Sequence, residues 1–219
     1  MGERGLKGVE GFLAELGSAE PIPGGGAAAA LAGALAAALV GMVAGISARR
    51  AAPEEGRLGR LKEEADGIRT ALTKAMEEDA AAYGRVAAAL RLPKGTDEEK
   101  AAREKALQGA LRKAAEVPLS TAEQALKVLE LCEEALPLAS RHLQSDIAVA
   151  VRLAQAAVHS ALYNVDANCL WMKDEDFLGN VRPLRTRIAE EADKKAFFML
   201  GRLEEGLKSW LGERDSNPH

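Results

Sequence analysis

A long segment rich in alanine and glycine and free of charged residues constrains the fold of this 219-residue chain most strongly. No Asp, Glu, Lys or Arg lies between Glu20 and Arg49. By length this segment could span a bilayer, but alanine contributes little transfer free energy because that free energy scales with the apolar area buried. Since long amphipathic helices are predicted beside it, residues 27–47 are expected to form an almost wholly buried core helix of a protein that does not enter a membrane.

Apolar residues recur at helical spacing through the rest of the chain, and no stretch alternates with the period of two that a strand requires. Pro118 is expected to break a helix that begins at the capping box of Thr96 and Glu99. The expected helices cover residues 6–16, 27–49, 54–90, 96–117, 121–137, 145–171 and 183–207, with start signals at Thr96, Thr121, Ser145 and Pro183. Because no repeat or long linker divides them, the sequence predicts one all-α domain, a helical bundle over residues 1–212, with a frayed tail over 213–219.

Charge and cysteine content point to a cytoplasmic protein. The formal net charge is −4 with both signs interspersed, whereas a nucleic-acid partner would require a clustered basic stripe. Cys132 and Cys169 are far apart and fit reduced thiols of the cytosol, and the charged N-terminus is unlike a signal peptide. The three histidines are scattered without metal-ligand spacing, so no metal site is expected.

Small residues repeat every four positions on one face of the central helix, at Gly33, Ala37, Gly41 and Gly45. Such a face lets another backbone approach closely. It indicates either close packing inside the bundle or a tight homodimer contact.

The loop Pro21-Ile22-Pro23-Gly24-Gly25-Gly26 stands directly before the central helix. Free N–H groups at a helix start attract anions and carbonyl oxygens. The loop is either a structural turn or a binding element.

Asp79 occupies a position where the helical pattern requires an apolar residue. The seven-residue register of the helix over 54–90 runs through Leu58, Ala65, Leu72, Asp79 and Val86. A buried carboxylate is costly unless paired and tends to have a raised pKa. Asp79 is therefore either a functional acid in a cleft or part of a solvated acidic turn with Glu77 and Glu78.

Asn164 and Asn168 lie four residues apart on one face of an otherwise apolar helix. Buried amides need partners, so these two either bind neighbouring helices or face a polar ligand. Asp146 shares their azimuth, but it precedes Asn164 by about 27 Å at about 1.5 Å per residue. Asp146 and Asn164 therefore cannot contact the same small group within one subunit.

Three segments of the chain form a pattern when they are taken together. They are Pro21 to Gly26; Asp79-Ala80-Ala81-Ala82-Tyr83 continuing to Leu92-Pro93-Lys94-Gly95-Thr96 and Val117-Pro118-Leu119; and Ser145-Asp146-Ile147 with Tyr163-Asn164-Val165 and Asn168. In this order they resemble the cyclodeaminase domain of formiminotransferase-cyclodeaminase and its stand-alone relatives, which include methenyltetrahydrofolate cyclohydrolases. The similarity runs from residue 17 to 196 and departs at Ala27, where the family often has serine, and near Ser140, where relatives often have Gly-Asn.

The resemblance implies an all-α homodimer that binds folate near the subunit cleft without a metal or redox cofactor. Asp79 matches the family's catalytic aspartate, and Lys94 is the candidate for the glutamate tail of a folate, including a polyglutamylated one. The implied substrate-binding residues are Gly24, Gly25, Gly26, Tyr83, Lys94, Asp146, Asn164 and Asn168.

The implied activity is cyclisation of 5-formiminotetrahydrofolate to 5,10-methenyltetrahydrofolate with release of ammonia. The alternative is methenyltetrahydrofolate cyclohydrolase at the same site. A second alternative is a non-catalytic helical dimer that binds folate or a partner.

Overall fold

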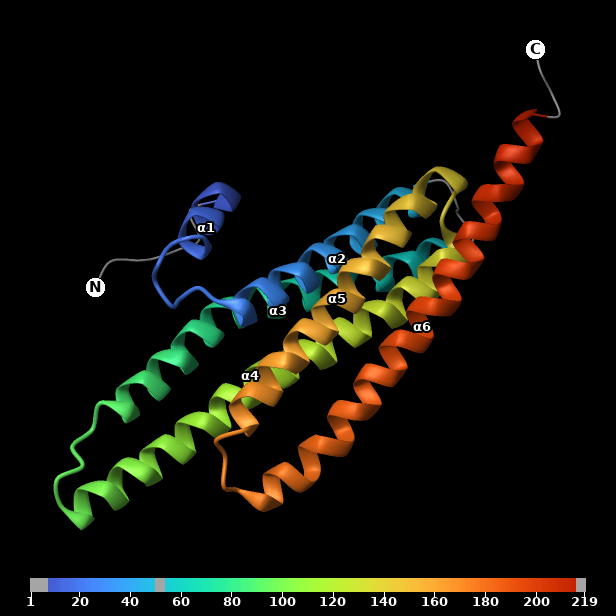
Figure 1. Ribbon diagram of the computed structural model, residues 1–219. Helices are drawn as coiled ribbons and strands as arrows, with labels where there is room; N and C mark the ends of the chain where they lie inside the picture. Colours follow the sequence, from blue (N-terminus) through green and yellow to red (C-terminus); the bar gives the residue numbers. More distant parts are fainter. Residues whose placement is uncertain (1–7, 50–53, 216–219) are drawn as a thin grey trace.

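The computed structural model describes residues 8–49 and 54–215, which fold into a bundle of long helices with α1 beside the start of α2 (Figure 1). No strand occurs among these described residues, and the all-α prediction is confirmed. The predicted domain limits remain a prediction. The helices are α1 (Gly8–Leu16), α2 (Gly25–Ala48), α3 (Glu55–Leu90), α4 (Asp97–Ala135), α5 (Gln144–Cys169) and α6 (Glu175–Asp215), with short 3₁₀ turns at Leu136–Leu138 and Arg141–Leu143.

Helix α2 is the predicted alanine-rich core helix, and it packs against α3, α4 and α5. It is the one described helix long and apolar enough to cross a membrane, but its inner sides are buried within the bundle. The expectation of nearly complete burial is wrong for the side of α2 that faces away from α3, α4 and α5. There Leu35 is 49% exposed and Met42 40% exposed.

The small-residue face of α2 packs against other helices of the same chain. Of the two predicted alternatives, the structure therefore favours close packing inside the bundle over a homodimer contact at this face. A Cβ at Gly33 would lie 3.0 Å from Leu72 of α3 and 3.5 Å from Ala157 of α5. A Cβ at Gly41 would lie 3.7 Å from the Cβ of Ala65. Glycine at these positions lets α3 approach α2 closely.

Helices α3 and α4 form a long hairpin. The capping box of Thr96 and Glu99 is present as predicted, and it begins α4. The predicted break at Pro118 is wrong, because α4 continues through it. Thr121 is consequently an internal residue whose hydroxyl donates to the carbonyl of Val117, not an N-cap.

The starts of the last two helices also differ from prediction. Helix α5 begins at Gln144, so Ser145 lies in its first turn and does not cap it. Helix α6 begins at Glu175, eight residues before Pro183. Asp174 provides the missed start signal, because its carboxylate accepts the N–H of Phe177 at 3.0 Å, as an N-cap does.

Candidate functional site

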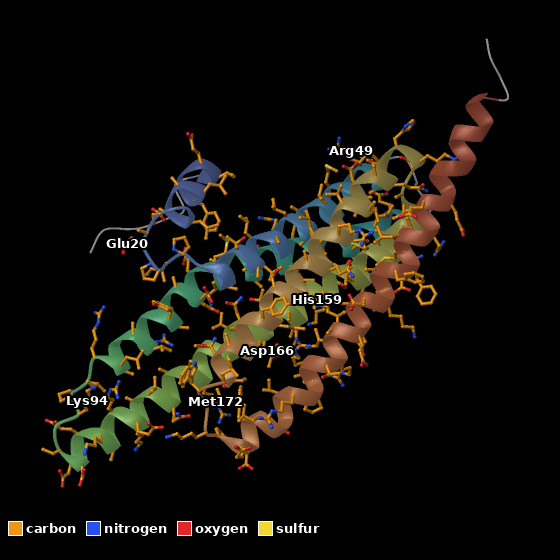
Figure 2. All side chains as sticks on the ribbon, in the orientation of Figure 1. Glu20, Arg49, Lys94, His159, Asp166 and Met172 are labelled. Carbon is orange, nitrogen blue, oxygen red and sulfur yellow. The ribbon has the colours of Figure 1, made fainter. Side chains whose placement is uncertain are left out.

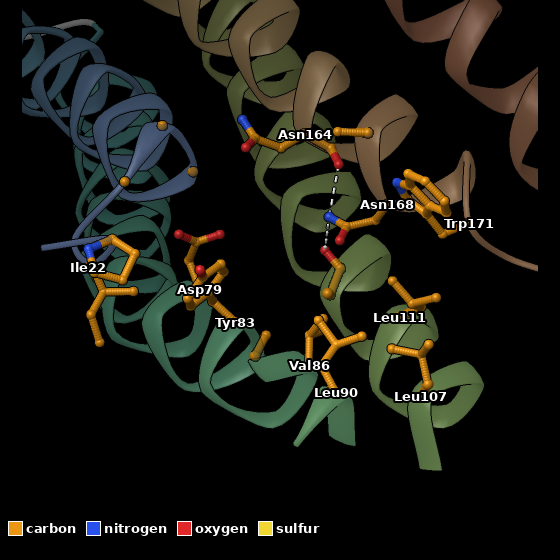
Figure 3. Close-up of a pocket in the computed structure, with 17 residues that line it drawn as sticks. Ile22, Asp79, Tyr83, Val86, Leu90, Leu107, Leu111, Asn164, Asn168 and Trp171 are labelled. Atoms are coloured by element: carbon orange, nitrogen blue, oxygen red, sulfur yellow. Dashed lines mark hydrogen bonds between the residues drawn. The ribbon is translucent and has the colours of Figure 1, made fainter. Parts of the chain in front are cut away.

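A cavity of about 590 Å³ opens where the N-terminus of α2, the second half of α3, the first half of α4 and the C-terminal end of α5 meet (Figure 3). One end is polar and the other is apolar. Seven of the predicted site residues line it together: Gly24, Gly25, Gly26, Asp79, Tyr83, Asn164 and Asn168.

Asp79 projects from α3 toward the start of α2. It is half-buried, whereas Glu77 and Glu78 are exposed, so the solvated-turn interpretation is wrong. Burial raises the pKa of Asp79 above its ordinary value, and a hydrogen bond from the backbone N–H of Ala27 opposes that shift. The N-cap of α2 is Gly24, which has no side chain to cap the helix. The Asp79 carboxylate therefore caps α2 from another helix.

Position 26 has no room for a side chain because the Asp79 carboxyl group lies against the Cα of Gly26. A Cβ built at Gly26 would lie 2.7 Å from Oδ2 of Asp79 and closer still to Oδ1 and Cγ. Gly25 and Gly26 occupy the first turn of α2, where N–H groups have no intrahelical acceptor. The glycine loop thus leaves room for the carboxylate and also presents donors to the cavity.

The two asparagines divide their hydrogen bonds between neighbouring backbone and the cavity. Nδ2 of Asn164 donates to the carbonyl of Ser160 at 2.9 Å. Nδ2 of Asn168 donates to the carbonyls of Asn164 at 2.8 Å and of Ala114, on α4, at 2.9 Å (Figure 3). Only Asn168 bonds to a neighbouring helix, as the first alternative predicts, whereas Asn164 bonds within its own helix. Both side chains line the cavity, and their contact with a polar ligand stays a prediction.

The apolar end of the cavity was not predicted. It is lined by Val86 and Leu90 of α3, Leu107 and Leu111 of α4, and Trp171 after α5. Gln108 holds the Trp171 turn, because its amide donates to the carbonyl of Trp171 at 3.1 Å and accepts the N–H of Lys173 at 2.8 Å. Helical periodicity alone assigns such leucines to the core. Their place in the lining of a cavity between α3 and α4 is visible only in the tertiary structure.

Lys94 and Asp146 lie outside the cavity. Lys94 is exposed at the tip of the α3–α4 hairpin, beyond Leu90 (Figure 2). Asp146 lies in the first turn of α5, at the end of that helix opposite the cavity. Asp146 and Asn164 belong to the same helix, so about 27 Å separate them along its axis at about 1.5 Å per residue.

Ala27, which stands where relatives often have serine, is fully buried. Its backbone N–H binds Asp79, so the first turn of α2 keeps a cap without the serine hydroxyl. The two cysteines are unpaired, as predicted.

Comparison with known proteins is consistent with this arrangement. A family model for formiminotransferase-cyclodeaminase matches residues 8–185. A methenyltetrahydrofolate cyclohydrolase of Methylorubrum extorquens is 39% identical over 171 residues, which cover 77% of this chain and 82% of that protein. A formimidoyltransferase-cyclodeaminase of Rattus norvegicus is 32% identical over 198 residues, which cover 90% of this chain but 37% of that protein.

The fold matches a solved structure as well. The crystal structure of a formiminotetrahydrofolate cyclodeaminase from Thermotoga maritima superposes with a TM-score of 0.76 at 25% sequence identity. The match covers 93% of this chain and 96% of that one.

Proposed function

The chain belongs to the formiminotransferase-cyclodeaminase family, and we propose that it is a folate one-carbon enzyme whose chemistry takes place at the Asp79 cavity. Its reaction is cyclisation of 5-formiminotetrahydrofolate with release of ammonia, or hydrolysis of 5,10-methenyltetrahydrofolate. One observation carries the proposal: a half-buried carboxylate lies at the polar end of a cavity of about 590 Å³, which is in the usual range for small-molecule sites.

In the cyclisation, N10 of the folate attacks the formimino carbon on N5, and a tetrahedral centre forms. Asp79 accepts the proton that N10 loses and then donates it to the departing amine. The C–N bond to that amine breaks, and ammonia leaves. One carboxylate can thus perform both proton movements, and a positioned general base is typically worth about 10²–10⁴-fold in rate.

In the hydrolysis, Asp79 accepts a proton from water as the oxygen adds to the methenyl carbon. It then protonates a ring nitrogen as that C–N bond breaks, while the hydroxyl proton passes to solvent. Both substrates are cationic at the reacting carbon, which a neighbouring carboxylate stabilises electrostatically. No oxidation state changes in either reaction and Asp79 accounts for the proton transfers, so we propose that neither reaction uses a metal or redox cofactor.

The two reactions are supported by different similarities. The bacterial relative that matches over most of its length is named for the hydrolysis, and the solved structure is named for the cyclisation. Asp79 serves either reaction, so the geometry of the cavity fits both.

The shape of the cavity supports one orientation of the substrate. The reacting carbon lies at Asp79, and the aminobenzoyl ring follows the apolar wall between α3 and α4. Leu90 follows Asp79 by about 17 Å along α3, at about 1.5 Å per residue. Lys94 lies beyond it, where the glutamate tail would leave the cavity.

We also propose that the protein is a homodimer formed through the uncovered side of α2. Leu35, Ala38 and Met42 recur there at helical spacing and are exposed, and α2 contains no charged residue. Apolar residues at this spacing are typical of a helix that packs on another helix. The N-terminal end of the same helix borders the cavity, as expected for folate near a subunit cleft.

A paired assay on the wild-type chain tests the activity. Release of ammonia from 5-formiminotetrahydrofolate establishes the cyclodeaminase, and accelerated loss of absorbance near 350 nm from 5,10-methenyltetrahydrofolate establishes the cyclohydrolase. Binding of folate without either turnover would instead establish the non-catalytic alternative.

Asp79→Asn tests the assigned base. The amide keeps the shape and can still accept the N–H of Ala27, but it cannot take a proton. Turnover should fall by about 10²-fold or more, a barrier increase of about 2.7 kcal/mol, while the Tm stays level or rises because a desolvated charge is removed. Near wild-type turnover, or an unfolded variant, would refute the role of Asp79 as a base.

A further inference from the structure

Pro118 occupies the interior of α4, where proline is strongly unfavourable because it has no N–H to donate. The carbonyl left without its helical partner is that of Ala114, four residues earlier. That carbonyl accepts the amide Nδ2 of Asn168, which comes from α5, at 2.9 Å. We propose that Pro118 is a positioning residue that fixes the orientation of the Asn168 amide in the folate cavity.

Asn168 is held by two backbone carbonyls at once. The second is that of Asn164, at 2.8 Å, within its own helix (Figure 3). Both hydrogens of Nδ2 are thereby used, and Oδ1 is the remaining hydrogen-bonding atom of a side chain that lines the cavity. The site therefore presents a fixed acceptor, and the ligand must present an N–H donor to it.

The inference rests on the proposed function, because a reduced folate carries N–H donors on its pterin ring. In α4 the ring of Pro118 keeps the helix from closing on the Ala114 carbonyl, whereas an N–H at position 118 would draw that carbonyl toward the helix axis and away from Asn168. The Asn168 amide would then keep one anchor, could rotate, and would present the cavity with either a donor or an acceptor. Pre-organisation of the amide, and with it affinity, would fall.

Pro183 provides a matched comparison within the same chain. It also lies inside a long helix, α6, and the carbonyl that it leaves without a helical partner is that of Gly179. Among the side chains that the structure describes, none donates to that carbonyl, and Pro183 does not line the cavity. Pro183→Ala therefore makes the same chemical change away from the site.

The test is a double-mutant cycle of Pro118→Ala and Asn168→Ala, with Pro183→Ala as the control. Binding of tetrahydrofolate to the wild-type chain is measured first. If the wild-type chain does not bind it, the proposed function is refuted, whereas the mutant cycle on a chain that binds it tests the role of Pro118. Pro118→Ala should raise the Kd about tenfold, the scale of one hydrogen bond, and should change kcat much less. In the Asn168→Ala background the same change should raise the Kd less than about twofold.

Equal effects of Pro118→Ala in both backgrounds would overturn the proposal, and so would wild-type affinity in Pro118→Ala alone. Asn168→Asp keeps the test decisive if Pro118→Ala does not fold. Its carboxylate has no N–H for the carbonyls of Ala114 and Asn164, so it should turn away from them, and the Kd should rise as much as in Asn168→Ala. Wild-type affinity in Asn168→Asp would refute anchoring by the two carbonyls.

Discussion

Gly26→Ala is the most direct test of how α2 and α3 build the site. The added methyl group would overlap the Asp79 carboxyl group, which is held by the N–H of the next residue, Ala27. The Cα of residue 26 belongs to a packed helix, so the side chain of Asp79 is the part that moves. We expect a displacement of about 1–1.5 Å, the shift needed to restore van der Waals contact.

The effects on stability and on activity should differ in size. Replacing glycine by alanine in a helix gains about 0.5–1 kcal/mol, whereas loss of the cap costs about 0.5–2 kcal/mol and the overlap about 1–3 kcal/mol. The net loss of unfolding free energy is then about 0.5–4.5 kcal/mol, and each kcal/mol lowers the Tm of a chain of this size by about 2–4 °C. A displacement of about 1 Å at a reacting group costs about 10²-fold in turnover.

The assay compares turnover and Tm of Gly26→Ala with those of Gly45→Ala. A Cβ at Gly45 would meet Lys62 at 3.6 Å, an ordinary contact with a flexible side chain. Gly45→Ala makes the same change in the same helix and should keep wild-type turnover with a level or higher Tm. Wild-type turnover in Gly26→Ala would refute the placement of the carboxylate against this glycine.

Three further outcomes follow from the structure. Burial raises the pKa of Asp79, and the base must be ionised, so kcat/KM should fall as the pH decreases through a pKa above the ordinary aspartate value of 3.8. The Asp79→Asn variant should lack this fall at acidic pH. A fall with a pKa at or below 3.8 would contradict the assignment of Asp79 as the base. Lys94→Ala should raise the KM for polyglutamylated folate more than it lowers kcat, and an unchanged KM would exclude tail binding by Lys94. Met42→Glu should yield a monomer by light scattering at micromolar concentration, because two carboxylates would meet at the proposed interface; a dimeric Met42→Glu variant or a monomeric wild-type chain would refute that interface.

The sequence by itself determined the class of fold and singled out the carboxylate that the structure places in the cavity. The absence of charge around α2 and the helical spacing elsewhere depend on local periodicity, which a single chain displays directly. The apolar seam singled out Asp79 because a carboxylate there conflicts with burial, and that conflict is visible without coordinates. The seam left a solvated turn open, and the resemblance to the family favoured the functional role. The capping box of Thr96 and Glu99 could also be predicted from the sequence, because both partners lie within one helical turn.

Only the tertiary structure decided which distant groups meet. Pro118 has the local signature of a helix break, yet α4 continues because its packing and the Asn168 amide compensate for the missing bond. Gly26 has the signature of a turn, yet the group that requires its bare Cα comes from another helix, more than fifty residues away. Lys94 and Asp146 share motifs with cavity residues but lie outside the cavity, because a helix separates its ends by its length. Sequence patterns report the neighbours of a residue along the chain, whereas the site depends on contacts between helices that only packing specifies.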